Sequence, residues 1–440
     1  LVGGAATLYY SSHGFISRST DTPASLWYDG RIGSGITVER RIFGRDGIGG
    51  LSRVFAEATL VNRDGGLDVL TRDYALDGRR ATLLIGPESG ARADFGIVMQ
   101  GVVETVSISL AAVTLKLSDG LAKLNRIANE STYAGTGGLE GGVDLKGKRK
   151  PRCLGKAFNI AAPLVDSTNL IYQVHNGAIK DVPIARDRGV SLTKVAGAPA
   201  AGEYQVDVSA GTVKLGATPA GTVTFDIEGD ASGAGYTEKR GDLILRLLAA
   251  GLNSSEIDPT SFAQLNSDDP APCGIWIGTE PAPIAAAIDE LLGEERFGGF
   301  ARAGIFTVGL VAAASGAPQA TFTEEDITAL EREPLPPAVE PVTWRVLVGY
   351  QKNYTVQSDL AAAVTPAQRT FAAEAMRVAE TKNPAIQSQR LLARDYGPVE
   401  GLYLNQSDAD AAAQRLFALW GSPRAAYRVG TRPHAMLLDL

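Results

Sequence analysis

Alternating hydrophobic and polar positions predict short β-strands through the first third of the chain. Five apolar segments rich in β-branched residues, separated by turn residues, lie at 36–42, 56–61, 80–85, 95–103 and 112–117. In the segment 112–117 the residues at odd positions are apolar, and the polar residues Thr114 and Lys116 stand at even positions. One buried and one wet face is typical of an antiparallel sheet. We therefore predict a β-sandwich or barrel over residues 31–130.

A second set of strands follows a glycine-rich connection. Residues 131–147 contain six glycines, which predicts a flexible linker that we extend to residue 150. The strand pattern then returns at 170–174, 189–192, 204–208, 212–215 and 223–227, with glycines in the intervening turns. This pattern predicts a second β domain over residues 151–235.

The hydrophobic period changes to that of a helix after this second set of strands. Apolar positions at helical spacing predict helices at 244–252 and 284–292, and between and after them we predict a strand at 274–277 and a hairpin at 297–311. These elements predict a small α+β domain over residues 236–332.

A proline-rich segment separates this domain from the C-terminal part. Residues 333–341 contain four prolines, which exclude a helix or a central strand and predict a linker. For the C-terminal domain, residues 342–440, we predict a strand at 342–350, helices at 365–380 and 408–420, and strands at 425–429 and 436–440. Ser407 is the expected N-cap of the second helix.

The predicted fold class is a β-rich α+β multidomain protein, with antiparallel β-barrel or sandwich domains and small inserted α+β domains. Residues 1–30 are predicted to form an N-terminal arm that precedes the first β domain. At 440 residues the chain is too long for one hydrophobic core. The 42 Lys and Arg against 49 Asp and Glu give a net charge of −7, whereas a nucleic-acid-binding domain would be basic. No signal peptide and no apolar run long enough to cross a membrane are predicted.

No arrangement of residues points to a known catalytic chemistry. The three histidines, His13, His175 and His434, are far apart in sequence, and His175 is expected at the edge of a hairpin. The glycines at 44–50 lack the ending of a phosphate-binding loop, and residues 86–90 do not form a nucleophile elbow. We therefore predict neither a nucleotide site nor a serine hydrolase.

Three clusters of carboxylates are the remaining candidates for catalysis. They lie at 267–269, 289–295 and 324–326, and a pair of acids can hydrolyse glycosides. The last cluster follows Thr323, where acids would stabilise the start of a helix, and the cluster at 289–295 would be the solvated end of a helix. We therefore favour structural roles and predict no enzymatic activity and no catalytic residue.

Cysteine usage predicts no cofactor and no disulfide framework. Cys153 and Cys273 are the two cysteines of the chain, and they lie about 120 positions apart. Two thiols cannot complete a four-thiolate zinc site within one chain. A metal or iron–sulfur centre would need several copies of the chain around a symmetry axis, so two reduced thiols are the favoured interpretation.

One strong local charge asymmetry stands out, at the end of the glycine-rich linker. We call it the basic segment, and its cations are Lys146, Lys148, Arg149, Lys150, Arg152 and Lys156. It has no interleaved aromatic residues on which bases could stack. We interpret it as an exposed loop or, as the functional alternative, as a contact with an acidic neighbouring subunit.

Residues 148–177 resemble a known family. The segments Lys148-Arg-Lys-Pro-Arg-Cys-Leu-Gly, Asn159-Ile-Ala-Ala-Pro-Leu-Val-Asp and Leu170-Ile-Tyr-Gln-Val-His-Asn-Gly are similar to the central motif of tail-tip baseplate hub proteins of siphophages, prophages and gene-transfer-agent tails. Residues 280–292, 300–309 and 344–357 are similar to later elements of this family. The resemblance covers about residues 30–440.

The resemblance implies a structural protein of the virion tail tip. It implies tube-like β domains at 31–130 and 342–440, a homotrimer, contacts with the distal tail protein, the tape measure and the central fibre, and a lumen that passes DNA without specific binding. Two other hypotheses remain open. A tail-associated cell-envelope hydrolase would need converging acids or a Cys/His pair, and a carbohydrate-binding module would need an exposed aromatic platform. Among the tryptophans, Trp344 and Trp420 are expected in the core.

Overall fold

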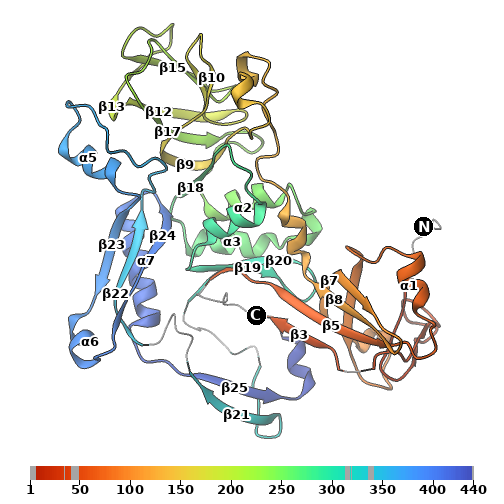
Figure 1. Ribbon diagram of the computed structural model, residues 1–440. Coiled ribbons are helices and arrows are strands. Elements are labelled where there is room, and N and C mark those ends of the chain that lie inside the picture. The colour runs from red at the N-terminus through yellow and green to blue at the C-terminus, as the bar shows by residue number, and fades with distance from the viewer. Residues whose placement is uncertain are drawn as a thin grey trace.

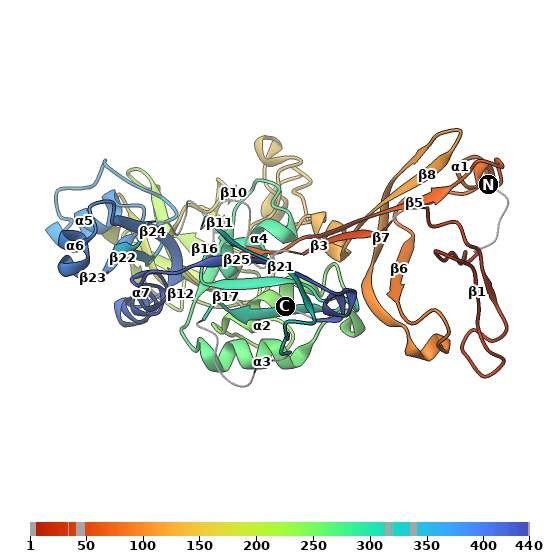
Figure 2. The ribbon, with the colours of Figure 1, turned by 90° about the horizontal axis from the view of Figure 1, so that it is seen from below.

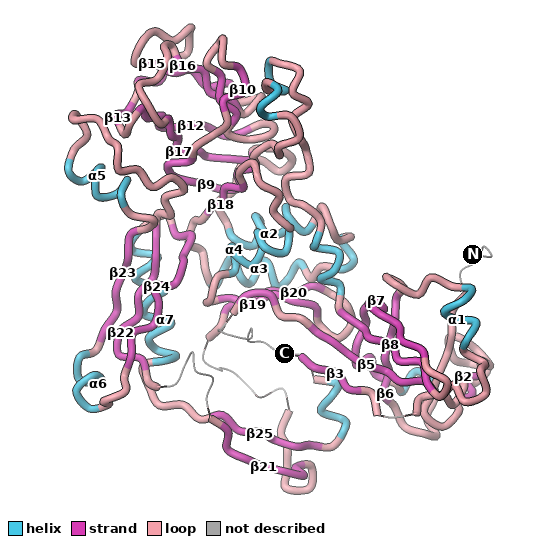
Figure 3. The backbone as a smooth tube through the Cα atoms, viewed as in Figure 1, coloured by secondary structure: helices cyan, strands magenta, loops and turns pink. Residues whose placement is uncertain are grey.

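Strands dominate the fold. The computed structural model describes residues 6–33, 35–40, 49–312, 318, 320–334 and 341–438. Within these residues it contains 25 strands and seven α-helices, which confirms the prediction of a β-rich α+β multidomain protein. Figures 1 and 3 show the helices α2, α3 and α4 at the centre, with strand-rich lobes arranged around them.

The N-terminal lobe is a curved antiparallel sheet in the order β3-β5-β8-β7-β6. Its strands are β3 (Thr37–Arg40), β5 (Val54–Val61), β6 (Arg80–Ile85), β7 (Gly96–Ile108) and β8 (Ala112–Ser118). In β5 buried and exposed residues alternate, so Ala56 and Leu60 face the core while Phe55 and Glu57 face outward. The short hairpin of β1 (Phe15–Ile16) and β2 (Trp27–Tyr28) and the helix α1 (Asp68–Asp73) complete the lobe. Figure 2 shows this lobe projecting to one side of the molecule.

The predicted flexible linker is folded. Residues 131–150 contain two 3₁₀ turns, Gly138–Glu140 and Val143–Leu145. Tyr133 and Leu145 are buried against Val165 and form a small core with it. The glycines therefore serve tight turns, several at positive φ, because only glycine adopts that conformation without strain.

Two sheets form the second β region, and their inner faces enclose a common core. The first has the order β10-β11-β16-β15-β14, with bounds Leu164–Asp166, Ile171–Gln173, Thr212–Leu215, Glu203–Asp207 and Thr193–Lys194. The second has the order β13-β12-β17-β9-β18, with bounds Val190–Ser191, Ile179–Asp187, Val223–Asp230, Arg152–Ile160 and Gly274–Ile277. Because β18 belongs in sequence to the predicted 236–332 domain, this second sheet crosses the predicted boundary.

The central part packs three helices against a small sheet. The helices are α2 (Arg240–Leu248), α3 (Pro259–Asp268) and α4 (Ile284–Leu292), and the hairpin is β19 (Arg296–Phe300) with β20 (Phe306–Leu310). A short strand from the N-terminal part, β4 (Gly50–Leu51), pairs parallel with β19. The helices bury Leu247, Ile288 and Leu291 completely, and each such side chain contributes about 1.5–3 kcal/mol.

The C-terminal lobe is a three-stranded sheet backed by a helix. Strand β22 (Thr343–Tyr350) lies between β23 (Arg377–Lys382) and β24 (Arg394–Tyr403), and α7 (Gln406–Trp420) packs on this sheet. Two short helices, α5 (Pro366–Ala373) and α6 (Pro384–Gln389), flank it. A separate two-stranded sheet joins β21 (Ile327–Glu333) to β25 (Ala426–Thr431). Since β21–β25 and β9–β18 pair across the predicted boundaries, the exact domain limits stay a prediction.

Five local predictions were wrong. The helix predicted at 365–380 ends at Ala373, because 377–382 pairs with β22 as a strand. The N-cap of α7 is Asn405 rather than Ser407, and 324–326 is a turn before a strand rather than a helix start. The strand predicted at 436–440 begins instead inside a 3₁₀ turn, Pro433–Leu437, and its last two residues lie outside the described residues. Trp344 and Trp420, expected in the core, are only half-buried, although Trp420 packs against the core of the C-terminal lobe. Most of the predicted proline linker, 335–340, lies outside the described residues.

Candidate functional site

Four of the six side chains of the basic segment have partners within their own chain, and two of these partners are carboxylates. Lys150 lies 2.6 Å from the Glu140 carboxylate, Arg149 donates to the Glu130 carbonyl at 2.6 Å, Arg152 donates to the Ala128 carbonyl at 3.2 Å, and Lys156 lies 3.2 Å from Glu228. These contacts hold the segment to the body of the protein. Only the charges of Lys150 and Lys156 are paired with a carboxylate in the described residues.

Lys146 and Lys148 are the exposed part of the basic segment. Both side chains face solvent on either side of Gly147, and Val143 beside them is 82% exposed. The turn that carries them is anchored by Tyr133, which is buried and lies beneath the Lys150 amine at 5.4 Å from its ring centroid. The exposed part of the candidate interface predicted from sequence is therefore a small protrusion with two solvent-facing lysines and an apolar side chain.

Both cysteines lie inside the protein. Cys153 on β9 and Cys273 just before β18 are fully buried, and burial raises the pKa of both thiols. A buried, protonated thiol cannot reach a metal shared between copies of the chain. Within the described part of the chain, no three His, Cys, Asp or Glu side chains lie close enough together to hold a metal ion.

His175 is buried rather than placed at the edge of a hairpin as predicted. Its Nδ1 accepts a hydrogen bond from the Cys153 backbone N–H at 2.9 Å. Burial lowers the pKa of His175 to about 4, although the nearby carboxylate of Asp230 acts in the opposite direction. The ring is therefore neutral at pH 7, and its role is to satisfy a buried donor.

This burial makes stability depend on pH. The pKa of His175 is about 4 in the folded protein and 6.5 in the unfolded chain. Between pH 4 and pH 6.5 the unfolded chain therefore binds a proton at this residue that the folded protein does not bind. We expect the unfolding free energy to fall by about 3 kcal/mol from this residue as the pH drops from 6.5 to 4. The variant His175→Asn keeps an acceptor for the Cys153 backbone N–H. In urea titrations at several pH values, its unfolding free energy should depend less on pH than that of the wild type. His13→Asn, at an exposed position, serves as the control, and an unchanged slope in His175→Asn would contradict the assignment.

The most concentrated set of charges in the described residues is a buried ion cluster that sequence reasoning missed. It joins the central helices to the C-terminal lobe and consists of Arg240, Asp269, Glu295, Arg296, Tyr403 and Arg415. Asp269 and Arg240 are each 1% exposed at the side chain. The members come from distant positions in sequence, so no local pattern announces them.

Asp269 is the centre of the buried ion cluster. Its carboxylate accepts from Arg296 Nε at 2.8 Å and lies 3.3 Å from Arg240 Nε. Burial alone would raise the pKa of Asp269, but the charges of Arg296 and Arg240 outweigh it, and the pKa is lowered. Asp269 is therefore ionised at pH 7 and is a structural counter-ion. An acid in this state cannot act as a general acid.

Glu295 corrects the prediction of a solvated helix end at 289–295. Glu295 is buried, and its carboxylate accepts hydrogen bonds from the Tyr403 hydroxyl at 2.8 Å and from Arg415 at 2.9 Å. Its neighbours also have partners: Glu294 accepts from Tyr396 at 2.6 Å and Glu290 accepts from Lys352 at 2.9 Å. These acids bind the central region to the C-terminal lobe.

Among the carboxyl groups that the structure describes, Asp119 has a raised pKa. Burial raises the pKa of Asp119 to about 6, against two backbone N–H groups that lower it. Those donors belong to Val54, at 2.8 Å, and Leu121, at 3.0 Å, so Asp119 caps a 3₁₀ turn. Both oxygens of Asp119 already accept a backbone hydrogen bond, and the nearby exposed carboxylate of Glu104 adds to the raised pKa, so Asp119 serves as a structural cap.

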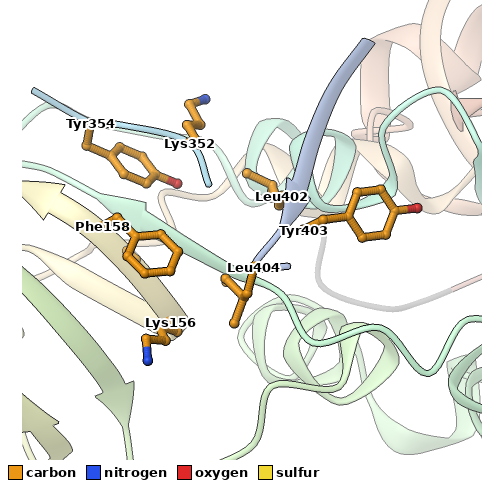
Figure 4. A pocket seen from close by; sticks show the side chains of 9 residues that line it. Lys156, Phe158, Lys352, Tyr354, Leu402, Tyr403 and Leu404 are labelled. Carbon is orange, nitrogen blue, oxygen red and sulfur yellow. The ribbon is translucent and has the colours of Figure 1, made fainter. Parts of the chain in front are cut away.

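A small crevice lies where the second β region meets the C-terminal lobe (Figure 4). Its cavity volume is about 10 Å³, far below the roughly 300 Å³ of a typical ligand site. Its lining includes Phe158, Tyr354 and Leu404, with Lys156 and Lys352 at opposite sides, their amines pointing outward. Lys352 lies 2.9 Å from Glu290, so its charge is already compensated. The crevice is a packing defect between lobes rather than a site for a substrate.

Together these features define a multidomain β-rich α+β protein whose charged side chains mostly hold its lobes together. In the part of the chain that the structure covers, no helix has the length and apolar character needed to span a bilayer. No family model matches the chain, and no curated protein matches it. Among solved structures, the chain is similar to the 43 kDa tail protein of prophage MuSo2 from Shewanella oneidensis, with 10% identity and a TM-score of 0.28, over 87% of this chain and 76% of that chain. A TM-score at this level supports no conclusion about a shared fold.

Proposed function

We propose that this chain is a structural baseplate hub of a long-tailed phage or phage-like tail, without enzymatic turnover. In this role it would join the tail tube and the distal tail protein to the central fibre, and it would close the tail tip before DNA ejection. The residue pattern of 148–177, which resembles the central motif of such hubs, suggests this class of protein. The open N-terminal sheet is the structural observation that carries the proposal.

The N-terminal sheet is curved but not closed. Its order β3-β5-β8-β7-β6 leaves β3 and β6 as edge strands within the described residues. An open edge presents unpaired backbone donors and acceptors, and closed barrels or rings of subunits remove such edges. The edge strand β6 is six residues long and half-buried at Leu83 and Leu84, so it is suited to pairing with another chain. A ring of copies would complete what one copy leaves open.

We further propose a homotrimer located at the tail tip of the virion, with the tape measure as a lumenal partner. The protrusion of Lys146 and Lys148 would contact an acidic surface of a neighbouring subunit. DNA would pass the lumen without specific binding, which agrees with the net charge of −7. The buried ion cluster supports a rigid part in an assembly, because it fixes the C-terminal lobe to the central helices.

The test is the mass of the purified chain, alone and with tail proteins. We expect an assembly of about three times the 46.1 kDa chain by light scattering, and a ring in electron images. The double variant Lys146→Glu/Lys148→Glu should weaken assembly about tenfold and reduce its salt dependence.

The matched control is Lys239→Glu/Arg390→Glu, which reverses two exposed charges elsewhere on the chain. It should leave assembly unchanged. A chain that stays monomeric at high concentration, both alone and with tail partners, would contradict the hub. If the two double variants assembled equally well, the protrusion of Lys146 and Lys148 would not be part of the interface.

A further inference from the structure

The two-stranded sheet of β21 and β25, here called the ribbon, packs against no other sheet or helix layer among the residues that the structure describes. Its strands come from positions about 100 residues apart, with Leu330 opposite Val429 and Glu331 opposite Arg428. All the interior residues of β21 from 328 to 332 are exposed. A two-stranded sheet exposed in this way is marginally stable in water, because it buries little apolar surface. Figure 1 shows the ribbon apart from the other sheets of the molecule.

The two faces of the ribbon differ in character. Directly opposite residues share a face, so Leu330, Val429 and Tyr427 lie on one face, with exposures of 62%, 44% and 58%. Glu331 and Arg428 lie on the other, where Arg428 also pairs with Glu333. Arg332, which pairs with Tyr427, also lies on the first face. That face is therefore mostly apolar and is exposed in the described structure, which is typical of an interaction surface.

The two sides of the ribbon carry opposite charge. Residues 324–333, which contain β21, hold five acids and one arginine, so their net charge is 1 − 5 = −4. Residues 421–438, which contain β25, hold three arginines and no acid, so their net charge is +3. On the acidic side Glu324, Glu325 and Glu331 are exposed, and on the basic side Arg424 and Arg428 are exposed.

This polarity decides between two ways of pairing. If two copies met through the same edge, β21 against β21 or β25 against β25, like charges would face each other, and such contacts are unfavourable. If the β25 edge of one copy met the β21 edge of the next, a segment of net positive charge would lie beside a segment of net negative charge. Pairing through two different edges is head-to-tail, and it closes into a ring when the rotation permits.

We propose that the ribbon is an interface between copies of this chain, in which the β25 edge of one copy pairs with the β21 edge of the next. The two ribbons then continue as one sheet, and the apolar face with Leu330, Tyr427 and Val429 is covered in the assembly. This rests on the proposed hub, and it names the surface by which its copies associate.

The test uses two variants, each with one added cysteine, so that the introduced thiols cannot cross-link to each other within one chain. Glu331→Cys places a thiol on β21 and Arg428→Cys places one on β25, both at exposed positions. The native Cys153 and Cys273 are fully buried and need not be removed. Each variant is oxidised alone, and then the two are mixed at the concentration at which the chain assembles and oxidised together.

We expect the mixture to yield about tenfold more disulfide-linked dimer than either variant alone, because assembly raises the effective concentration of the two thiols. The control mixture of Asp268→Cys with Arg390→Cys, two exposed positions on other elements, gives the background level. Dimer formed by Glu331→Cys alone would overturn head-to-tail pairing, and so would a mixed yield at the background level.

Light scattering on the same samples separates the two proposals. Assembled protein without the mixed cross-link contradicts the ribbon interface and leaves the hub in place. Protein that does not assemble contradicts the hub itself. Leu330→Ser/Val429→Ser provides a second measurement, since it should abolish assembly while Leu110→Ser, at a 97% exposed position on another hairpin, should not.

Discussion

Replacing Asp269 with asparagine should lower the unfolding free energy by about 3–5 kcal/mol, because it leaves buried arginines without their counter-ion. Asp269 is the carboxylate that Arg240 and Arg296 share, and all three side chains are almost completely buried. Asparagine keeps the shape and one acceptor but removes the charge, so the loss measures electrostatics rather than packing. Urea denaturation at pH 7, followed by tryptophan fluorescence, would give the difference.

The neighbouring residue provides the control for this prediction. Asp268 is exposed and accepts a hydrogen bond from Gln264 at 2.8 Å on the surface of α3. Asp268→Asn should change the unfolding free energy by no more than about 0.5 kcal/mol. If Asp269→Asn cost as little as this, the buried ion cluster would not be what holds the C-terminal lobe to the central helices.

The second large effect is expected at Gly155, where β9 meets β18. Gly155 has φ +67° and faces Gly274 across the strand pair, and a Cβ at Gly155 would lie 2.2 Å from the Cys273 carbonyl oxygen. Gly155→Ala should cost about 3–5 kcal/mol, of which the left-handed backbone accounts for about 1–2 and the forced separation of the strands for the rest. Thermal or urea unfolding of the purified variant would measure this cost.

Gly147 separates the two contributions. It has φ +81°, and no atom lies within 4 Å of where its Cβ would be. Gly147→Ala should therefore show the backbone cost alone, about 1–2 kcal/mol. Equal losses at Gly147 and Gly155 would mean that the strands at the β9–β18 junction separate without cost, and the argument from close approach would be wrong.

Several elements could be predicted from sequence alone because their signal is local. The strands at 80–85, 212–215 and 274–277 and the helix at 284–292 have the predicted bounds. In each, the period of the apolar positions matches the period of the structure, and turn residues or prolines mark the ends. Such segments need no information from the rest of the chain.

The helix predicted at 365–380 shows where local signals fail. Its alanines favour a helix, and the first half is helical as far as Ala373. Residues 377–382 instead pair with β22, where Ala379 is 1% exposed in the core of the C-terminal lobe. Burial against the sheet outweighs a helix propensity of a few tenths of a kcal/mol per residue.

The candidate site was predictable only in part, for a related reason. The basic segment is evident as a run of cations, but sequence does not show that Glu140 and Glu228 neutralise two of them. The buried ion cluster carries no local pattern, since Asp269, Glu295 and Arg415 lie far apart along the chain. Charges at neighbouring positions are visible in a sequence, whereas the pairs that matter energetically form between distant segments.

By itself, the sequence determined the β-rich α+β class, most strand and helix positions and the basic segment, because these depend on the period and composition of short stretches. Only the tertiary structure decided that the glycine-rich segment is folded, that both thiols and His175 are buried, and that β21 pairs with β25 in an uncovered ribbon. Those features depend on which distant segments meet. Such meetings are set by burial and strand pairing over the whole chain, which no local window contains.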